Sequence, residues 1–163
     1  MIGQEKVYER LSQLGIPFDY VEHPEAPTIE ISRQYWVDPA STHCKNLFFR
    51  NHKGNRHYLV IFHCDHTLAI RDLEQLLHQG KLSFASEQRM MKYLGLKPGS
   101  VSPFGLVNDI NHEVYVFLDE NLKKAEKLSF HPNDNRASLS IRTEDFIRYM
   151  DESGNGYEWI SLY

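Results

Sequence analysis

The stretch from Leu96 to Asp109 most constrains the fold, because it is too broken for a helix and too apolar for a solvated loop. It reads Leu-Lys-Pro-Gly-Ser-Val-Ser-Pro-Phe-Gly-Leu-Val-Asn-Asp. Pro98 and Pro103 fix their own φ and favour extended conformations in the residues before them, while Gly99 permits a positive φ. Between them, residues 100–102 keep free backbone N–H groups. The stretch predicts an ordered loop that holds these donors toward a bound group, and a rigid turn between two elements explains it equally well.

The composition predicts one ordinary globular domain. The chain has 163 residues, of which 41% are hydrophobic and 25% charged, and its formal net charge is −4. This charge does not suit a general nucleic-acid binder, but it leaves room for a local basic patch that binds one phosphate or one RNA end. There is no apolar signal segment and no run of membrane-spanning length. We therefore expect a single cytoplasmic domain, residues 1–163, that is monomeric and has no contact with a membrane.

Apolar periodicity predicts an α+β domain in which a mixed, largely antiparallel sheet has flanking helices. Helices are expected where apolar residues recur at helical spacing: 5–14, 28–35 (capped by Thr28), 70–78, 86–94 and 143–150, with a helical turn at 119–124. Strands are expected at 18–22, 43–49, 57–64, 82–85, 113–118, 127–130, 137–141 and 157–162. The strands and helices follow no regular βαβ rhythm, and neighbours resembling hairpins are common.

The usual motifs of metal, nucleophile and phosphate chemistry are absent from the sequence. The run from His63 to His66 is rich in metal-ligand types, but consecutive strand residues point to opposite faces and cannot all meet one ion. No HExxH, paired CxxC, GxSxG, Walker or GxGxxG motif occurs. Cys44 and Cys64 are expected to be buried small hydrophobes. We therefore expect neither a metal nor a cofactor.

Two polar features stand out against apolar strands. Lys45 and Asn46 interrupt the run around 43–49, where an unpaired buried ammonium would cost several kcal/mol. If Lys45 faces a cleft it can meet a phosphate, a carboxylate or a carbonyl oxygen; alternatively it is an edge-strand lysine that guards against aggregation. Strand alternation should send Lys45 and Asn46 to opposite faces unless a bulge intervenes. His131, at the end of another strand, by itself fits a turn histidine better than a catalytic base.

Together these motifs resemble a known family. Lys45-Asn46-Leu47-Phe48 on a strand, the loop from Gly99 to Pro103 continued as Phe-Gly-Leu-Val-Asn-Asp, and a later Phe130-His131-Pro132-Asn133 occur in that order. They resemble the freestanding prolyl-tRNA editing proteins of the superfamily that includes YbaK and the insertion domain of prolyl-tRNA synthetase. The resemblance covers nearly the whole chain. It implies an α+β, metal-free deacylase that hydrolyses alanine from mischarged proline tRNA.

The resemblance also implies roles for individual residues. Lys45 would hold the terminal adenosine of the tRNA, and Asn46 would position the aminoacyl group or the attacking water. The loop backbone would contact the aminoacyl ester, and Ile31 would form a wall that excludes larger side chains. The implied catalytic set is Lys45, Asn46, Gly99, Ser100, Val101, Ser102 and Pro103, and the implied substrate-binding set is Ile31, Phe104, Asn108, Asp109 and His131.

The physical chemistry of an aminoacyl ester suits this function. Such an ester is already reactive, so an enzyme needs positioning and oxyanion donors more than a strong nucleophile. Backbone N–H groups near residues 100–102 would supply the donors, and water would attack. Apolar pockets discriminate only weakly per methylene group, so proline has to be spared by size exclusion. A small pocket would admit alanine and exclude the larger proline.

Three hypotheses remain open at this point. The first is trans-editing of alanyl-tRNA(Pro), with tRNA and prolyl-tRNA synthetase as partners. The second keeps the fold but changes the substrate to a tRNA mischarged with cysteine or serine. The third is a non-catalytic module that binds a tRNA or a synthetase.

Overall fold

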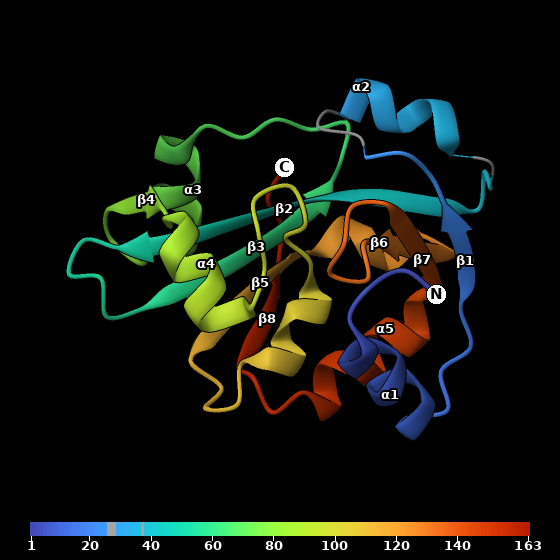
Figure 1. Cartoon of the computed structure of the whole chain (residues 1–163). Coiled ribbons are helices and arrows are strands. Elements are labelled where there is room, and N and C mark those ends of the chain that lie inside the picture. Colours follow the sequence, from blue (N-terminus) through green and yellow to red (C-terminus); the bar gives the residue numbers. More distant parts are fainter. Residues whose placement is uncertain (26–28, 37) are drawn as a thin grey trace.

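The sheet organises the fold. The computed structural model describes residues 1–25, 29–36 and 38–163. Within them, strands form a mixed sheet in the order β1-β7-β6-β2-β3-β5-β8, and β4 pairs separately with β2 (Figure 1). The strand pairs β1–β7, β2–β3, β2–β4 and β6–β7 are antiparallel, whereas β2–β6, β3–β5 and β5–β8 are parallel.

The elements follow one another along the chain with short connections. In order they are α1 (Glu5–Gln13), β1 (Asp19–Glu22), α2 (Ile29–Ser32), the 3₁₀ helix η1 (Arg33–Tyr35), β2 (Ser41–Asn51), β3 (His57–His63), α3 (Ile70–Leu77), β4 (Leu82–Phe84), α4 (Glu87–Leu94), the 3₁₀ helix η2 (Pro103–Asn108), β5 (Val114–Asp119), the 3₁₀ helix η3 (Glu120–Lys124), β6 (Lys127–Phe130), β7 (Ala137–Arg142), α5 (Thr143–Glu152) and β8 (Tyr157–Ile160).

Local sequence explains where α4 begins and ends. The Ser86 hydroxyl accepts a hydrogen bond from the Arg89 N–H at 3.2 Å, which satisfies one of the free donors of the first turn. Gly95 ends the helix with a φ of 64°, a conformation that glycine adopts without the cost a Cβ would bring. The helix therefore ends where the loop that starts at Leu96 begins.

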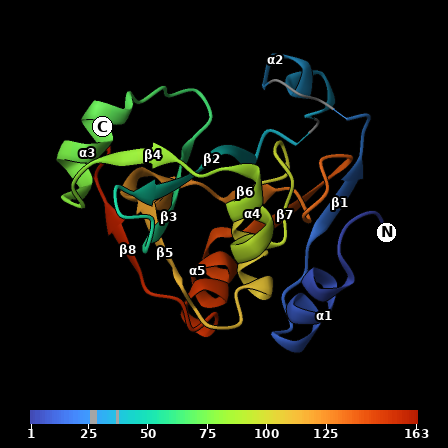
Figure 2. The ribbon, with the colours of Figure 1, turned by 60° about the vertical axis from the view of Figure 1, so that its left-hand side comes forward.

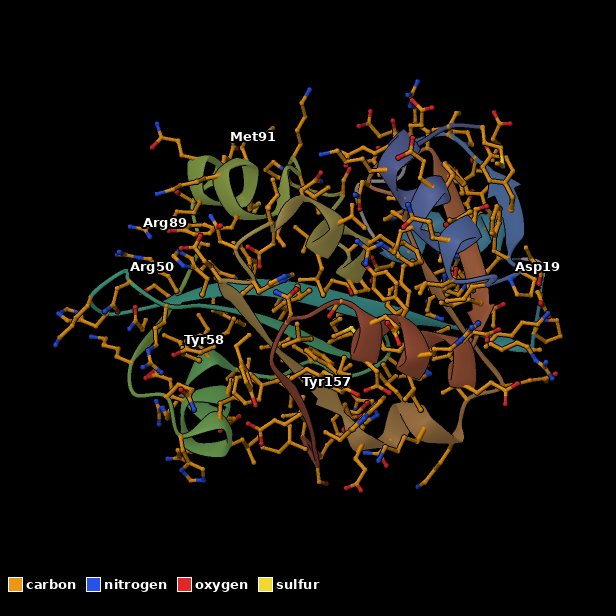
Figure 3. The ribbon with its side chains drawn as sticks, turned by 90° about the horizontal axis from the view of Figure 1, so that it is seen from below. Asp19, Arg50, Tyr58, Arg89, Met91 and Tyr157 are labelled. Carbon is orange, nitrogen blue, oxygen red and sulfur yellow. The ribbon has the colours of Figure 1, made fainter. Side chains whose placement is uncertain are left out.

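The core lies on both faces of the sheet. On one face, α1, α4, η2 and α5 pack against alternate residues of the central strands, including Phe48, Leu59 and Val116. On the other face, α3 packs against Phe49 and Val60. Figure 2 shows α3 on one side of β3 and β5 and the helices α1, α4 and α5 on the other. The turn at 51–56 joins β2 to β3 at one end of the sheet, where Arg50 and Arg89 lie together (Figure 3).

One edge of β2 is only partly paired. On the side opposite β3, β6 pairs with residues 41–43 of β2 and β4 pairs with residues 49–51. No described strand pairs with residues 44–48 on that side, although the Ala85 N–H donates to the Phe48 carbonyl at 2.9 Å. Lys45 and Asn46 therefore lie on a length of strand whose edge is open.

The predicted elements and fold class are confirmed, with two exceptions. The stretch 96–109 is not helix-free, because its last part forms η2. Pro103 stands at the first position of this helix, where its missing N–H costs nothing, and the Ser102 hydroxyl accepts from the Phe104 N–H at 3.1 Å. The sheet is also less antiparallel than expected. Thr28, the predicted cap, lies outside the described residues. None of the helices in the described part of the chain is long and apolar enough to cross a membrane.

Asp109 should be a major source of stability. It is 4% exposed, and its carboxylate accepts hydrogen bonds from the Glu113 N–H (3.1 Å), the Val114 N–H (2.8 Å) and the Asn155 side-chain amide (2.8 Å). We expect Asp109→Ala to lower the free energy of unfolding by about 3 kcal/mol, because two buried donors and one part-buried donor lose their acceptor. Urea unfolding measures this, with exposed Asp72→Ala as the control. Equal stability of both variants would contradict this role.

Candidate functional site: a cleft on the open edge of β2

A cleft in the described structure follows the open edge of β2. It has a volume of about 420 Å³, within the range of ligand sites. It passes between the end of β6 on one side and Phe84 of β4 on the other, and the loop after α4 covers it. The lining residues are His23, Ser32, Trp36, His43, Cys44, Lys45, Asn46, Leu47, Phe48, Cys64, Phe84, Met90, Pro98, Gly99, Val101, Ser129, Phe130, His131 and Ser138.

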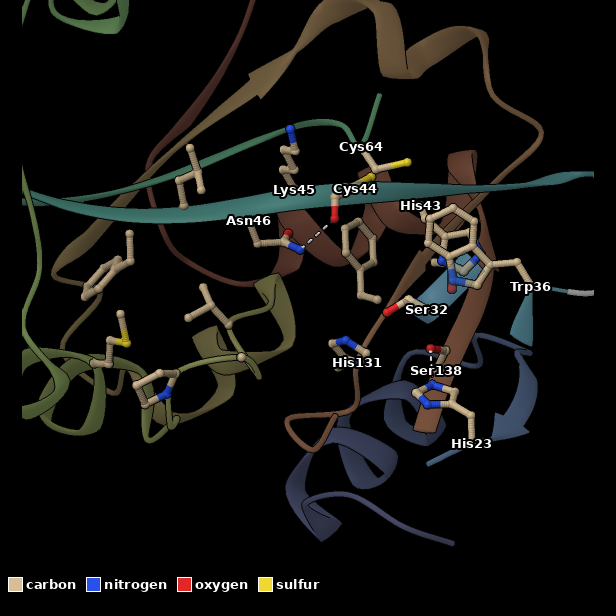
Figure 4. Close-up of a pocket in the computed structure, with 18 of the residues that line it drawn as sticks. His23, Ser32, Trp36, His43, Cys44, Lys45, Asn46, Cys64, His131 and Ser138 are labelled. Atoms are coloured by element: carbon tan, nitrogen blue, oxygen red, sulfur yellow. Dashed lines mark hydrogen bonds between the residues drawn. The ribbon is translucent and has the colours of Figure 1, made fainter. Parts of the chain in front are cut away.

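Lys45 and Asn46 leave β2 in opposite directions, as strand alternation predicts (Figure 4). The Lys45 ammonium donates to the Thr67 hydroxyl at 3.0 Å and to the His66 carbonyl, and it lies 6.0 Å from the centre of the Phe62 ring. The Asn46 side chain donates to the Cys44 carbonyl at 3.3 Å, while its oxygen Oδ1 is buried without a partner among the described residues. Buried amide oxygens are rarely left unsatisfied, so Asn46 is the conspicuous polar group of the open edge.

The covering loop presents backbone rather than hydroxyl groups. Gly99 has a φ of 85°, which an L side chain adopts only under strain. The Ser100 N–H donates a hydrogen bond to the Lys97 carbonyl at 3.1 Å. The N–H groups of Gly99 and Val101 have no acceptor among the described residues. Ser100 and Ser102 are 8% and 0% exposed. The free donors of this loop therefore belong to Gly99 and Val101, both of which line the cleft.

Histidines line the opposite end of the cleft. His131 Nδ1 lies 2.8 Å from the Ala137 carbonyl, and since a carbonyl only accepts, Nδ1 carries the proton and Nε2 keeps a lone pair. By the same argument the His23 Nδ1–H donates to the Pro24 carbonyl at 3.0 Å, and His23 Nε2 lies 2.9 Å from the Ser138 hydroxyl. Figure 4 shows the His131 side chain below the strand, on the side toward which Asn46 points.

Burial keeps this end of the cleft uncharged. Desolvation lowers the pKa of His43 to about 4, and the neighbouring His131 and His23 add to the effect. Desolvation also lowers the pKa of His131, although its hydrogen bond to Ala137 opposes the shift. The His43 ring stacks on Trp36 with the ring centres 3.8 Å apart. Imidazoles in this state offer lone pairs and N–H groups rather than positive charge.

The predicted site residues divide into two groups. Lys45, Asn46, Gly99, Val101 and His131 line the cleft. The residues outside its lining are Ile31, Ser100, Ser102, Pro103, Phe104, Asn108 and Asp109.

Most of this second group shapes the loop and its supports. Phe104 is fully buried in the core, and the Pro103 carbonyl accepts from the Tyr149 hydroxyl at 2.8 Å. The Asn108 amide donates to the Gln4 side chain and to the Leu94 carbonyl, both at 2.8 Å. Asp109 uses its carboxylate for the bonds described above. Ile31, on α2, is 38% exposed and precedes the cleft residue Ser32.

The comparisons with known proteins show the family of the chain. The family model of the aminoacyl-tRNA editing domain matches residues 23–149, from the cleft residue His23 to α5. The chain belongs to the aminoacyl-tRNA editing domain family. It is 38% identical over 162 residues to the prolyl-tRNA editing protein ProX of Acetoanaerobium sticklandii, covering 99% of each chain. It is also 32% identical to the prolyl-tRNA synthetase associated domain-containing protein 1 of Mus musculus, with 95% of each chain covered.

A solved structure shows the same fold. It is described as a candidate trans-editing enzyme for prolyl tRNA synthetase and superposes with a TM-score of 0.72 at 21% identity, covering 96% of this chain and 94% of that one. A shorter match links the chain to the proline–tRNA ligase of Bacillus subtilis, at 28% identity over 103 residues, which are 63% of this chain and 17% of the ligase. The matched segment is most of this chain and a small part of the ligase.

One sequence argument about this editing domain is wrong. Strand alternation does not separate the side chains of His63, Cys64 and Asp65, because β3 ends at His63 and a turn follows. Their potential ligand atoms lie within 4.8 Å of one another. Several already have partners, since Asp65 pairs with Arg33 and His63 Nδ1 accepts from the Asp65 N–H at 3.0 Å. Cys64 is buried, as expected, and Cys44 is half-buried. Desolvation raises the pKa of both thiols and favours the protonated form.

Several cleft residues were not predicted from the sequence. His23 stands before a proline, directly after the strand expected at 18–22, while Ser138 looks like an ordinary polar position of β7. They meet because β1 pairs with β7, a contact between residues more than 100 positions apart. Phe84 looks like a core residue of β4 but is 55% exposed. No local signal in the sequence separates these residues from structural ones.

The protonation states of the cleft histidines can be measured. We expect His43 to stay neutral at pH 6 and to gain a proton only around pH 4, because burial opposes its charged form. His131 should titrate below the ordinary histidine value of about 6.5. An NMR titration of the imidazole C–H signals, assigned with His43→Gln and His131→Gln, tests both expectations. A His43 midpoint at or above about 6.5 would contradict the buried, uncharged cleft.

Proposed function

We propose that this chain is a trans-editing deacylase that hydrolyses the ester of alanine on mischarged proline tRNA. One observation carries the proposal: Asn46, the loop donors of Gly99 and Val101, and His131 converge on a single cleft in a chain of the aminoacyl-tRNA editing family. The likeness to a protein named prolyl-tRNA editing protein supports the choice of tRNA.

The reaction needs an oxyanion site. Water adds to the ester carbonyl, the bond from carbonyl carbon to ribose oxygen breaks, and the products are alanine and a tRNA with a free hydroxyl. Negative charge develops on the carbonyl oxygen before that bond breaks. Gly99 and Val101 line the cleft and their N–H groups have no acceptor among the described residues, so we assign these donors to this oxygen.

Water activation falls to the neutral side chains opposite the loop. His131 has its Nδ1–H fixed by Ala137, which leaves Nε2 to accept a proton or a hydrogen bond from the attacking water. The partnerless oxygen of Asn46 gives the water, or the substrate ammonium, a second acceptor. A general base with a lowered pKa stays unprotonated at neutral pH, as the reaction requires.

Lys45 acts on the other side of the strand. Its ammonium is bound to the segment at 66–67 rather than to Asn46 or His131. No described carboxylate forms an ion pair with it. We assign it to the terminal adenosine of the tRNA, whose phosphate can replace the two neutral acceptors.

The alanine preference would come from α2. Ser32 of α2 lines the histidine end of the cleft, and Ile31 precedes it, so a larger amino acid would meet this helix before its ester reached Gly99. We further propose that the reaction needs no metal, that the chain acts as a cytoplasmic monomer, and that prolyl-tRNA synthetase is the enzyme whose errors it corrects.

A panel of aminoacyl-tRNAs tests the function. We expect release of alanine from alanyl-tRNA(Pro), with or without a chelator, and little hydrolysis of prolyl-tRNA(Pro). Lys45→Ala should reduce the rate by about 100-fold, because an electrostatic contact to the substrate is lost. Lys6→Ala, an exposed lysine of α1, is the control for charge.

The other outcomes separate the alternatives. Faster release of cysteine or serine would keep the deacylase and change its substrate. Saturable tRNA binding without hydrolysis of any substrate would leave a binding module. Full activity of Lys45→Ala would refute the role of its ammonium, and loss of activity with the chelator would refute metal independence.

A second prediction concerns the loop. Ser100→Ala and Ser102→Ala should keep activity within about threefold, because neither hydroxyl is exposed to the cleft. Gly99→Ala should lower it by about 100-fold, since a residue with a Cβ at a φ of 85° would shift the donors of the oxyanion site. Single-turnover deacylation measures this at temperatures where all three variants are folded. Serine variants as inactive as Gly99→Ala would point instead to hydroxyl chemistry.

A further inference from the structure

An exposed aromatic ring lies at the end of the cleft away from the histidines. Phe84 is 55% exposed, on the short strand β4, and its ring stacks on Phe49 with the centres 4.7 Å apart and the planes inclined by 27°. Phe49 is fully buried, so the exposed surface of Phe84 faces away from it. Exposing such a ring is costly unless something covers it in use. One side of Phe84 is therefore available for a flat ligand.

Two arginines lie at the same end of the sheet as this ring. Arg50 pairs in register with Ser83, the neighbour of Phe84, and Arg89 lies on α4, which follows β4. Both guanidinium groups lie against Gly54 in the turn between β2 and β3, and Arg89 donates to the Gly54 carbonyl at 2.9 Å. Figure 3 shows the two side chains together at this end of the sheet. Among the described residues, no carboxylate pairs with either arginine.

The positive charge at this end of the sheet lowers the pKa of a buried histidine, His57. The pKa of His57 falls to about 4, first because of burial and then because of the positive charges of Arg89, Lys92 and Arg50. His57 Nε2 also lies 2.9 Å from Arg89 Nη1 and accepts a hydrogen bond from it. Positive charge at the same end of the sheet as an exposed aromatic ring matches the chemistry of single-stranded nucleic acid, which offers flat bases and phosphates.

The ring at the opposite end of the cleft is less available. Trp36 already stacks on His43 at 3.8 Å, and the Arg33 guanidinium lies 5.0 Å from the centre of the Trp36 ring. Along β2, Phe84 stands opposite Phe49, three residues and about 10 Å from Asn46. That separation leaves room for a nucleoside between the Phe84 ring and the proposed reaction centre.

We propose that Phe84 is a stacking platform for a base at the unpaired 3′ end of the tRNA, and that Arg50 and Arg89 bind the phosphates leading to it. The proposal rests on the proposed function for the identity of the RNA. It assigns the two ends of the cleft: the nucleotide enters past Phe84, and the amino acid lies toward the histidines and α2. Phe84 is thus a substrate-binding residue outside the motifs of the family resemblance.

Binding of an uncharged RNA tests the platform without relying on catalysis. The probe is a fluorescent RNA hairpin with a single-stranded CCA end, measured by anisotropy. Phe84→Leu keeps an apolar side chain over Phe49 but removes the π face, and it should weaken binding by about tenfold, the loss of one stacked base. Phe84→Trp should bind within about threefold of the original chain. Ile110→Leu, at a site 77% exposed and outside the cleft, is the control, and melting curves confirm that each variant is folded.

The contribution of the arginines to RNA binding can be measured separately, through the salt dependence of the binding constant. Each phosphate contact that is lost should reduce the slope of log K against log salt by about 0.7 for a single strand. Arg50→Gln should show this reduction, whereas Lys6→Gln on α1 should keep the original slope. Arg50→Gln is preferred to an Arg89 variant because Arg89 also supports Gly54 and His57.

The outcomes separate this proposal from the deacylase function. If alanyl-tRNA is hydrolysed but Phe84→Leu binds the hairpin as tightly as the original chain, the platform is refuted and the deacylase stands. If no substrate is hydrolysed but binding depends on Phe84 and Arg50, the platform stands and the deacylase fails. An unchanged salt slope in Arg50→Gln refutes the phosphate contact of Arg50.

Discussion

The open length of β2 is the constraint on which the rest of the site depends. A strand edge exposes backbone donors and acceptors that favour further strand pairing, and proteins usually cover such edges. Here β6 and β4 pair with the two ends of β2 and leave residues 44–48 between them. The loop from Pro98 to Val101 covers this interval without pairing as a strand, so a cleft remains. A continuous β-ladder along this edge would leave no room for the cleft.

Charge is distributed unevenly around this edge. The cleft interior is neutral, because burial holds His43 and His131 in their uncharged forms, whereas the cations lie at its margins. Lys45 projects to the far side of β2, and Arg50 lies beyond Phe84. This separation suits an aminoacyl nucleic acid, whose ester requires directed dipoles while its phosphates require positive charge. It would also let a chain with a net charge of −4 bind the end of an RNA, as we propose.

Sequence patterns predicted what local physics determines. Apolar spacing located the elements, and Ser86 and Gly95 marked the ends of α4, because caps depend on neighbouring residues. The parallel pairing of β2 with β6 was not predictable in this way, since it joins segments about 85 residues apart. Lys45, Asn46 and Gly99 were singled out because their types are unusual where they stand. His23 and Ser138 are ordinary in type, and only the pairing of β1 with β7 brings them into the cleft. Asp109 was expected at the substrate, but its three hydrogen bonds hold the segment after η2.

The volume of the cleft bears on how an editing domain selects its amino acid. At about 420 Å³ it is far larger than an alanyl group requires, so total size cannot be what excludes proline. To exclude proline, the cleft must hold the ester at a fixed point. The part of the cleft that receives the amino-acid side chain beyond that point must also be short. In the proposed function, the donors of Gly99 and Val101 would provide such a point, and α2 would limit the space on the histidine side. Selectivity therefore depends on how firmly the nucleotide end is held: a base that slides along β2 would let a larger amino acid reach the donors. The same physical requirement links the rigid loop, the open strand edge and the ring of Phe84.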